Sequence, residues 1–419
     1  MGNPDPPGIA GAPPSAPPDC FDKRLAALDG GISALIDLDR LAENVSFILR
    51  DLLPPGAGLM AVVKANAYGH GYLPCARTVL EAGATSLAVA RIEEALLLRR
   101  SGIAAPVLVV GAPNLALVAD AARAGVELAV GSLAAVAAMA RRLDEDDSLP
   151  PVRLHVKVDS GMRRFGVEPA DAPALARAIA ANPRMRVEGL FTHFATADEE
   201  DDSFVKEQVR RFEQARHGLA ASGIVPPQIH VANSGAALRH VTLPGVTAIR
   251  MGISLYGLSP SAKVPVTPDF RSFMKLRTRI VRAFTLAPGE GLSYGLTWVA
   301  PAPTRCATLA GGYADGLSRS LGNRGWAGVK GQRCPIIGRV CMDQVMIDTG
   351  AATGVQEGDE AVLIGDGWDG EMTIDQAAAL CGTINYEVVC AVAARVPRLY
   401  VRGGRPFAIH DLAGYIERS

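Results

Sequence analysis

The chain is 419 residues long, is 49% hydrophobic, and carries 42 Lys and Arg against 43 Asp and Glu. This length exceeds that of a usual single domain and predicts two domains, each with enough apolar residues for a core. The balanced charge excludes a general attraction to nucleic acid or to an anionic membrane, so we expect neither as a partner.

The seven cysteines and the first residues favour a soluble, cytoplasmic protein. The cysteines are odd in number, scattered and without a CxxC pair, so neither a disulfide framework nor a metal site is expected. Residues 1–30 are rich in Pro, Gly and Ala and lack the apolar stretch of a secretory signal, which predicts a flexible tail. The longest uncharged apolar segment, 128–140, is too short to cross a bilayer.

Between residues 31 and 265, short apolar runs alternate with amphipathic segments. Segments such as 91–100, 133–142 and 204–221 have helical spacing. Eight strand and helix units predict a (β/α)8 TIM-type barrel. An open doubly wound sheet would alternate in a similar way, but no GxGxxG motif follows a strand to favour it. The apolar runs lie near 59–63, 86–90, 107–110, 126–130, 152–158, 187–192, 228–232 and 247–250.

Residues 266–419 lose the helical spacing and predict a mostly β C-terminal domain. One helix is expected near 374–381. A strand at 31–38 has two alternative partners, the barrel that follows it or this second domain. The apolar runs of the domain lie at 276–284, 304–310, 334–340 and 361–364, separated by Pro, Gly and Asp.

Lys64 follows the first apolar run of the predicted barrel and opens the loop ANAYGHG. This position is the C-terminal end of a barrel strand, where barrel enzymes place their chemistry. A lysine carried by a buried strand into a small glycine-bearing loop is poorly solvated and well suited to form an imine. An ordinary surface lysine at the end of a strand is the alternative that these features alone leave open.

Two loops near the end of the barrel predict a phosphate site. The seventh strand leads into Ala232-Asn233-Ser234-Gly235, and the eighth leads into Arg250-Met251-Gly252-Ile253. A hydroxyl on one loop and free backbone N–H groups on the other would form a neutral, rigid cup. Loops after strands seven and eight often bind phosphate in such barrels, although ordinary turns would look similar.

Motifs in both domains resemble those of alanine racemases, in the same order. The segment AVVKANAYGHG around Lys64 is similar to the pyridoxal 5'-phosphate (PLP) attachment segment of this family and of related barrel enzymes. Several matches lie in the β domain, which simpler PLP-binding barrels lack. The other matching strings are HVKVDSGMRRFGV, FTHFATADEED, IHVANSGA, IRMGISLYG, LSYGLTW, GYADGLSR, IGRVCMDQ and GTINYEVVC.

The resemblance implies a two-base reaction. Lys64 would hold PLP as an imine and serve one face of the substrate α-carbon, while Tyr294 from the second subunit of a homodimer would serve the other. His193 and Arg250 would continue a hydrogen-bonded chain from Tyr294 towards the cofactor ring. Arg250 would face the pyridine nitrogen, to which a guanidinium can donate without giving up its proton. A barrel decarboxylase is expected to place a carboxylate there.

The resemblance also implies contacts to the cofactor and the substrate. Arg164 would bind the phenolic oxygen of PLP and the substrate carboxylate, steadied by Lys157, which family members carry as a carbamate. The neighbouring Arg163 is expected to pair with Asp198 or Glu199. Phosphate contacts are expected from Tyr68, Ser234, Gly252, Ile253 and Tyr386, and substrate contacts from Met342, Asp343 and Tyr313, the last narrowing the entrance.

We therefore predict an alanine racemase that interconverts L- and D-alanine as a homodimer and supplies D-alanine for peptidoglycan. Three alternatives remain open at the level of sequence. They are a broader serine and alanine racemase, a barrel-type PLP decarboxylase, and a non-enzymatic PLP-binding barrel. The discrimination between alanine and larger substrates is small, because one methylene is worth only about 1–3 kcal/mol.

Overall fold

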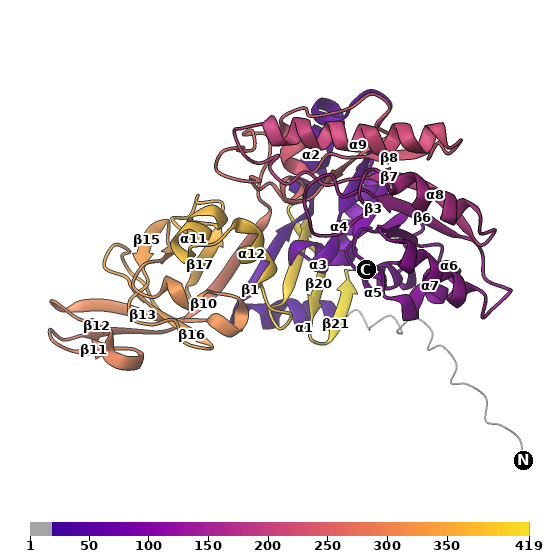
Figure 1. Cartoon of the computed structure of the whole chain (residues 1–419). Coiled ribbons are helices and arrows are strands. Elements are labelled where there is room, and N and C mark those ends of the chain that lie inside the picture. The colour runs from indigo at the N-terminus through magenta and orange to yellow at the C-terminus, as the bar shows by residue number, and fades with distance from the viewer. Residues whose placement is uncertain (1–18, 419) are drawn as a thin grey trace, which may run out of the picture.

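A closed barrel of eight parallel strands forms the centre of the computed structural model, which describes residues 19–418 (Figure 1). The ring closes where β9 pairs with β2, with Arg250 opposite Met60. The strands read as nearly continuous aliphatic runs because both of their faces are buried. The predicted barrel is confirmed. Its strands are β2 (Gly58–Val62), β3 (Ser86–Val89), β4 (Val107–Val109), β5 (Glu127–Val130), β6 (Val152–Lys157), β7 (Met185–Phe191), β8 (Gln228–His230) and β9 (Ala248–Met251).

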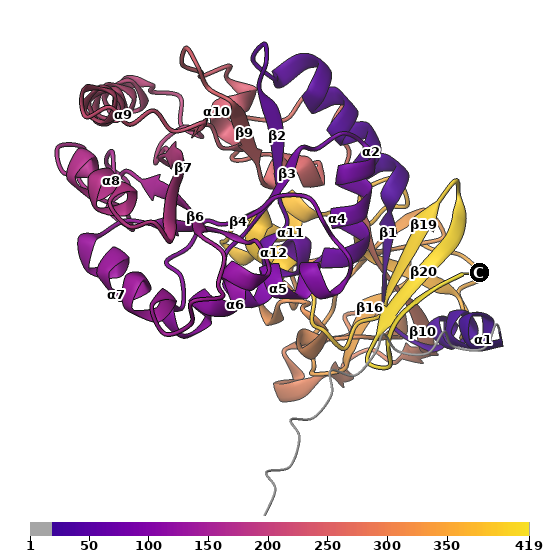
Figure 2. The ribbon, with the colours of Figure 1, turned by 90° about the vertical axis from the view of Figure 1, so that its right-hand side faces the viewer.

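Helices surround the ring of strands, as the view into the barrel shows (Figure 2). The longest, α9, buries Val205, Phe212 and Leu219, which recur every seven residues and so share one face. The helices of this part are α2 (Leu38–Phe47), α4 (Tyr72–Glu81), α5 (Ile92–Arg100), α6 (Val118–Arg123), α7 (Leu133–Leu143), α8 (Ala172–Ala180), α9 (Ser203–Ala221) and α10 (Ser234–Leu238). A further short segment, α3 (Lys64–Tyr68), follows β2.

The second part of the chain is a mostly β domain, as predicted, built around the 13-residue strand β10. The early strand β1 lies in this sheet, antiparallel to β10 and parallel to β19. The strands are β1 (Ser33–Asp37), β10 (Met274–Leu286), β13 (Thr304–Ala310), β14 (Trp326–Val329), β15 (Gln332–Pro335), β16 (Gln344–Asp348), β17 (Glu360–Gly365), β18 (Met372–Thr373), β19 (Arg398–Arg402), β20 (Arg405–Asp411) and β21 (Gly414–Glu417), with a separate pair β11 (Gly291–Leu292) and β12 (Trp298–Val299).

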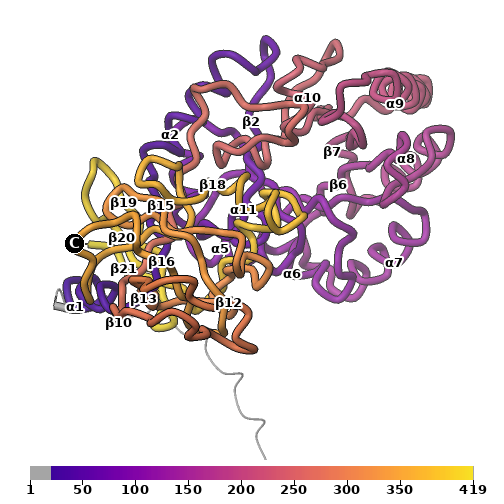
Figure 3. The backbone as a smooth tube through the Cα atoms, turned by 90° about the vertical axis from the view of Figure 1, so that its left-hand side faces the viewer, coloured from indigo at the N-terminus to yellow at the C-terminus, as the bar shows by residue number. Residues whose placement is uncertain are grey.

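Part of the segment predicted as a flexible tail is folded. Residues 1–18 lie outside the described residues, but α1 (Asp19–Ala27) and the 3-10 turn η1 (Leu28–Gly30) pack against the second sheet (Figure 3). Phe21 and Leu28 bury their side chains with Ile409 of β20. The prediction was wrong here because these apolar residues have a partner nearly 400 positions away, which local composition does not reveal.

Two further expectations in the β domain need correction. The run 334–340 was expected to be one strand, but β15 ends at Pro335, where the missing N–H of proline limits the ladder. One helix was expected, and it is present as α11 (Ile374–Cys381). A second helix, α12 (Asn385–Cys390), follows it and contacts α3 of the barrel. Its six residues are too few to show helical periodicity.

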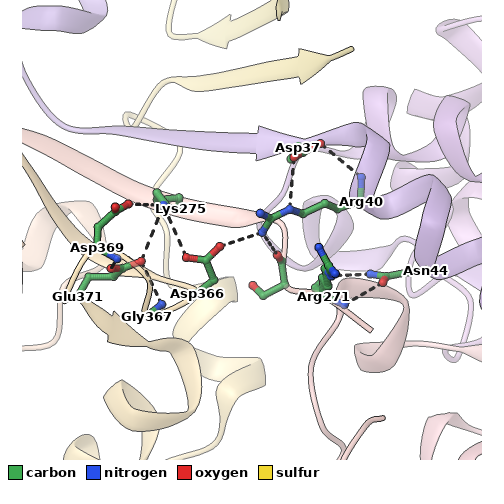
Figure 4. Close-up of polar contacts among 10 residues, drawn as sticks. Asp37, Arg40, Asn44, Arg271, Lys275, Asp366, Gly367, Asp369 and Glu371 are labelled. Atoms are coloured by element: carbon green, nitrogen blue, oxygen red, sulfur yellow. Dashed lines mark hydrogen bonds and ion pairs between the residues drawn. The ribbon is translucent and has the colours of Figure 1, made fainter. Parts of the chain in front are cut away.

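A polar network joins the barrel helix α2 to the second domain (Figure 4). Arg40 donates to Asp366 at 2.9 Å, and Asp366 also lies 3.6 Å from Lys275 of β10. Asn44 Nδ2 donates to the Arg271 carbonyl at 3.0 Å, and Asn44 Oδ1 accepts from the Arg271 N–H at 3.0 Å. The half-buried contacts of Arg40, Asp366 and Lys275 therefore connect the two domains at several points.

The described helices include none that is both long and apolar enough to cross a membrane.

Candidate active site

A cavity of about 490 Å³ opens at the C-terminal ends of the barrel strands. This is the end where the loops of a barrel carry function. Tyr386 reaches the cavity from α12, so the second domain supplies one wall. The predicted residues that the structure brings together in this cavity are Lys64, Tyr68, Lys157, Arg164, His193, Ser234, Arg250, Gly252, Ile253 and Tyr386.

Lys64 sits at the start of a strained turn. The next four residues, from Ala65 to Tyr68, all have positive φ, between 51° and 56°. A left-handed conformation costs roughly 1–2 kcal/mol for each residue that carries a Cβ. The turn is held by the Ala65 N–H, which donates to the Glu94 carboxylate at 2.7 Å, and by the Gly69 carbonyl, which accepts from Arg398. Strain of this kind persists only where the surroundings enforce it.

The amine of Lys64 is easier to deprotonate than that of a free lysine. Burial lowers its pKa, and the positive charge of Arg164 lowers the pKa further. An unprotonated amine is the form that attacks a carbonyl group or accepts a proton.

A neutral cup lies beside Lys64. The Ser234 hydroxyl accepts hydrogen bonds from the backbone N–H groups of Gly252 at 3.0 Å and Ser254 at 3.3 Å. A Cβ at Gly252 would lie 2.8 Å from the Tyr68 hydroxyl, so any larger residue would fill the cup. The buried hydroxyl of Ser254 has no hydrogen-bond partner in the structure. The hydroxyl hydrogens of Ser234 and Ser254 have no acceptor among the described residues, so both can donate to a phosphate group.

Arg250 is buried, yet it is the most heavily bonded side chain of the site. Its Nη2 donates to the Thr192 carbonyl at 2.7 Å, and its Nη1 donates to the His230 carbonyl at 2.8 Å. Burial lowers the pKa of Arg250 to about 9, which still leaves the guanidinium charged at pH 7. Arg250 Nη2 also lies 3.3 Å from His193 Nδ1. Because a guanidinium only donates, His193 Nδ1 accepts, and the proton of the neutral ring is on Nε2.

Lys157 and His193 are both held towards the neutral form. Burial, together with the positive charge of Arg250, lowers the pKa of Lys157 to about 7 and that of His193 well below its usual value. Arg163 forms an ion pair with Glu168, so the expected pairing with Asp198 or Glu199 is wrong. The positive φ of Arg163 turns the loop so that this arginine points to its own segment.

Four predicted residues lie outside the cavity of this chain. Tyr294 is 72% exposed on the turn between β11 and β12. These two strands lie at the end of the second domain remote from the barrel (Figure 1). Tyr313 and Met342 are also exposed, and Asp343 accepts from Arg395 at 2.6 Å. A single chain therefore does not bring these side chains to Lys64.

Sequence reasoning missed several residues around the cavity. Asn233, Met162 and Cys390 line it, while Glu94 and Arg398 hold the Lys64 turn. Asn233 caps α10 through the Ala236 N–H, and an Asn directly before a helix is a signal that sequence could have used. Glu94 and Arg398 carry no such signal, because they reach the turn from elements distant in the sequence.

Comparisons with known proteins match the chain over both domains. The family model described as the alanine racemase N-terminal domain matches residues 36–260, and that of the C-terminal domain matches residues 273–400. The chain is 42% identical over 386 residues to an alanine racemase from Geobacillus kaustophilus, covering 90% of this chain and 97% of that one.

Solved structures agree with these matches. The alanine racemase of Bacillus anthracis with bound L-Ala-P is 36% identical, with a TM-score of 0.84 over 92% of this chain and 98% of that one. A histidine racemase from Leuconostoc mesenteroides is 27% identical, with a TM-score of 0.81 over 89% of this chain and 98% of that one. Fold, cavity and matches define a two-domain barrel racemase, an enzyme of the isomerase class. The chain belongs to the alanine racemase family.

Proposed function

We propose that this protein interconverts L- and D-alanine with PLP bound at Lys64, and that it works as a homodimer. The observation that carries the proposal is one cavity that joins a lysine of lowered pKa, a neutral phosphate cup and a buried arginine. When bound, PLP supplies an aldehyde that reacts with amines and a conjugated ring that accepts the electron pair left by the α-proton.

The residues of the cavity have distinct parts in the proposal. Lys64 carries the cofactor and accepts or returns a proton on one face of the α-carbon. The cup of Ser234, Tyr68 and the Gly252 and Ile253 backbone, with Tyr386, binds the phosphate without a cation. Arg250 donates a hydrogen bond towards the ring nitrogen and keeps its own proton, which limits the ring as an electron sink. A carboxylate at this place would favour the decarboxylase alternative, so Arg250 argues against it.

The homodimer explains why Tyr294 is far from Lys64 in one chain. Exposed Tyr294, Tyr313 and Met342 form part of an uncovered surface on the second domain, and exposed aromatic and Met side chains are typical of interface cores. We propose that this surface meets the cavity of a second chain. Tyr294 then serves the opposite face of the α-carbon, Met342 and Asp343 meet the substrate, and Tyr313 narrows the entrance.

Lys157 is proposed to carry a carbamate. A lysine with a pKa of about 7 is half unprotonated at neutral pH, and only the free amine reacts with carbon dioxide. The added negative charge would face Arg250 and Arg164, whose positive charges now disfavour a charged lysine there. Such a group would steady Arg164 against the phenolic oxygen of PLP and the substrate carboxylate. The proposed supply of D-alanine to peptidoglycan and the cytoplasmic location follow the family and the cysteine usage.

Incubation of the purified protein with L-alanine in heavy water tests the proposal. We expect deuterium at the α-carbon together with a falling optical rotation, and parallel reactions with L-serine and L-histidine measure the substrate range. Release of carbon dioxide would identify a decarboxylase, and the absence of both reactions a binding barrel. Lys64→Ala should abolish racemisation and the visible absorption of bound PLP together, whereas Lys263→Ala, at an exposed site, should preserve both.

A further inference from the structure

Four buried side chains form a line of hydrogen bonds through the inside of the barrel. Glu127 Oε2 of β5 lies 3.0 Å from His155 Nε2 of β6. His155 Nδ1 lies 2.9 Å from His230 Nε2 of β8, and His230 Nδ1 lies 3.0 Å from Arg250 Nη1 of β9. None of the four is more than 5% exposed. The cavity is not lined by Glu127, His155 or His230, so the proposed reaction assigns these residues no role.

A glycine makes the line possible. Strand β7 lies between β6 and β8, so the His155 ring must cross β7 to reach His230. It crosses at Gly189, where a Cβ would lie only 2.1 Å from His155 Nδ1. On the other side, the Phe191 ring stacks on His230 with centroids 4.8 Å apart. Gly189 therefore leaves space for the His155 ring, which the Cβ of any other residue at this position would block.

The two ends of the line determine every proton within it. A guanidinium only donates, so His230 Nδ1 must accept from Arg250, and the ring carries its proton on Nε2. That proton is donated to His155 Nδ1, so His155 also carries its proton on Nε2. His155 then donates to Glu127 Oε2, which must accept. A second proton, on Nδ1 of His230 or of His155, would face the N–H of Arg250 or of His230, and two donors cannot form a hydrogen bond.

The electrostatics favour a neutral His230 and an ionised Glu127. Burial, followed by the charge of Arg250, lowers the pKa of His230 well below its usual value. Burial opposes the charge of Glu127, yet the hydrogen bond from His155 and the charge of Arg153 bring its pKa below the usual value. Arg153 lies 3.2 Å from Glu127 Oε1, at the end of the line remote from the cavity.

The line decides how Arg250 faces the cavity. Nη1 and Nη2 are bonded to His230, His193 and backbone carbonyls, while Nε bonds to nothing in the described part of the chain. Arg250 lines the cavity, so Nε–H is the donor left for a ligand. A fixed acceptor at Nη1 restricts the guanidinium to this orientation.

We propose, building on the proposed function, that Glu127, His155 and His230 are positioning residues that hold Arg250 as an oriented donor to the cofactor ring. Both histidines stay neutral with the proton on Nε2, and the negative charge that balances Arg250 stays two rings away on Glu127. This separation keeps a carboxylate from the ring nitrogen, where it would accept the bond that Arg250 donates.

Magic-angle-spinning NMR of the holoenzyme with ¹⁵N-labelled histidine tests the proton positions directly. We expect the rings of His155 and His230, assigned by their mutual Nδ1–Nε2 contact, to have Nδ1 unprotonated and Nε2 protonated at pH 7. A proton on Nδ1 of either ring, or a charged ring at pH 7, would overturn the proposal. This measurement does not depend on racemisation. If the wild-type protein racemises alanine but shows other tautomers, the proposed line is refuted and the proposed function stands. If the expected tautomers are found but the protein neither binds PLP nor racemises alanine, the proposed function is refuted, and with it the role assigned to the line.

Three variants test the role of the line. Glu127→Gln keeps an acceptor oxygen but loses the charge, so we expect the His155 Nε2–H signal to shift and kcat to fall roughly tenfold with the KM for alanine little changed. Gly189→Ala should displace the His155 ring, give mixed His230 tautomers and lower kcat at least as much. Glu188→Gln, the neighbouring carboxylate on β7, is the matched control and should change neither signal nor rate. Unchanged kcat in folded Glu127→Gln would show that the line does not act through Arg250.

Discussion

Single buried residues of this protein are kept in the protonation state that their neighbours allow. His70 is completely buried, and its Nδ1 lies 2.9 Å from the Tyr68 carbonyl and 3.1 Å from that of Ala67, so the proton is on Nδ1. Burial lowers the pKa of His70 to about 4. The ring therefore holds the turn after Lys64 as a neutral donor.

This gives the stability a predictable dependence on pH. The unfolded chain protonates His70 below about pH 6.5, while the folded protein does not until about pH 4, so stability falls as the pH drops through this window. At pH 5 the loss from this residue is about 2 kcal/mol. His70→Asn keeps an N–H donor without titrating, so urea unfolding at pH 7 and pH 5 should differ by about 2 kcal/mol less than in wild type. Exposed His217→Asn serves as the control, and an equal pH dependence in both variants would contradict the argument.

Tyr294 supports a second prediction at this scale. The equilibrium constant of racemisation is one, so kcat/KM in the two directions must stay equal in any variant. The loss of one base is instead visible in exchange of the α-proton. Tyr294→Phe should nearly abolish interconversion, while one enantiomer still exchanges its α-proton with heavy water through Lys64. NMR of each enantiomer measures this exchange, and similar mild losses for both would refute Tyr294 as a base.

At the scale of elements, the segment labelled α3 is a left-handed turn, and it carries strain that the rest of the fold must balance. Ala65 is exposed and has φ 52°, whereas an ordinary helical alanine such as Ala137 of α7 is unstrained. Glycine accepts positive φ without a steric cost. The two alanines should therefore respond to the same substitution in opposite ways.

Ala137→Gly should lower the free energy of unfolding by about 1 kcal/mol, as expected in a helix interior. Ala65→Gly should raise it by about 0.5 kcal/mol, because relief of strain exceeds the added entropy of the unfolded chain. Chemical denaturation with saturating cofactor compares the pair. Equal losses in the two variants would mean that the turn after Lys64 is not strained.

At the scale of the whole molecule, the proposed homodimer gives the second domain a part in two sites. Its α12 closes the cavity of its own chain through Tyr386, while the exposed side of the domain carries Tyr294 and Met342. Under the proposed function, each active site takes Lys64 from one chain and Tyr294 from the other. Two defective chains can then combine into one complete site.

Mixed dimers test this sharing. Lys64→Ala and Tyr294→Phe homodimers should each be nearly inactive. Unfolding and refolding an equal mixture should form heterodimers in about half of the molecules, each with one intact site, and so recover about a quarter of the wild-type activity. The same treatment of each variant alone is the control. No recovery, with heterodimers verified by mass spectrometry, would place both residues in the site of one chain.

The sequence by itself determined the eight barrel strands, the β character of the second domain, and Lys64 at the C-terminal end of the first barrel strand. These features depend on local periodicity and on the order of elements, which a chain carries whatever its final contacts. Only the tertiary structure decided the partners of β1 and the packing of α1. It also decided the hydrogen bonds of Glu94 and Arg398 to the Lys64 turn and the line from Glu127 to Arg250. Each joins elements that are separate along the chain, and such contacts exist only once those elements have packed together.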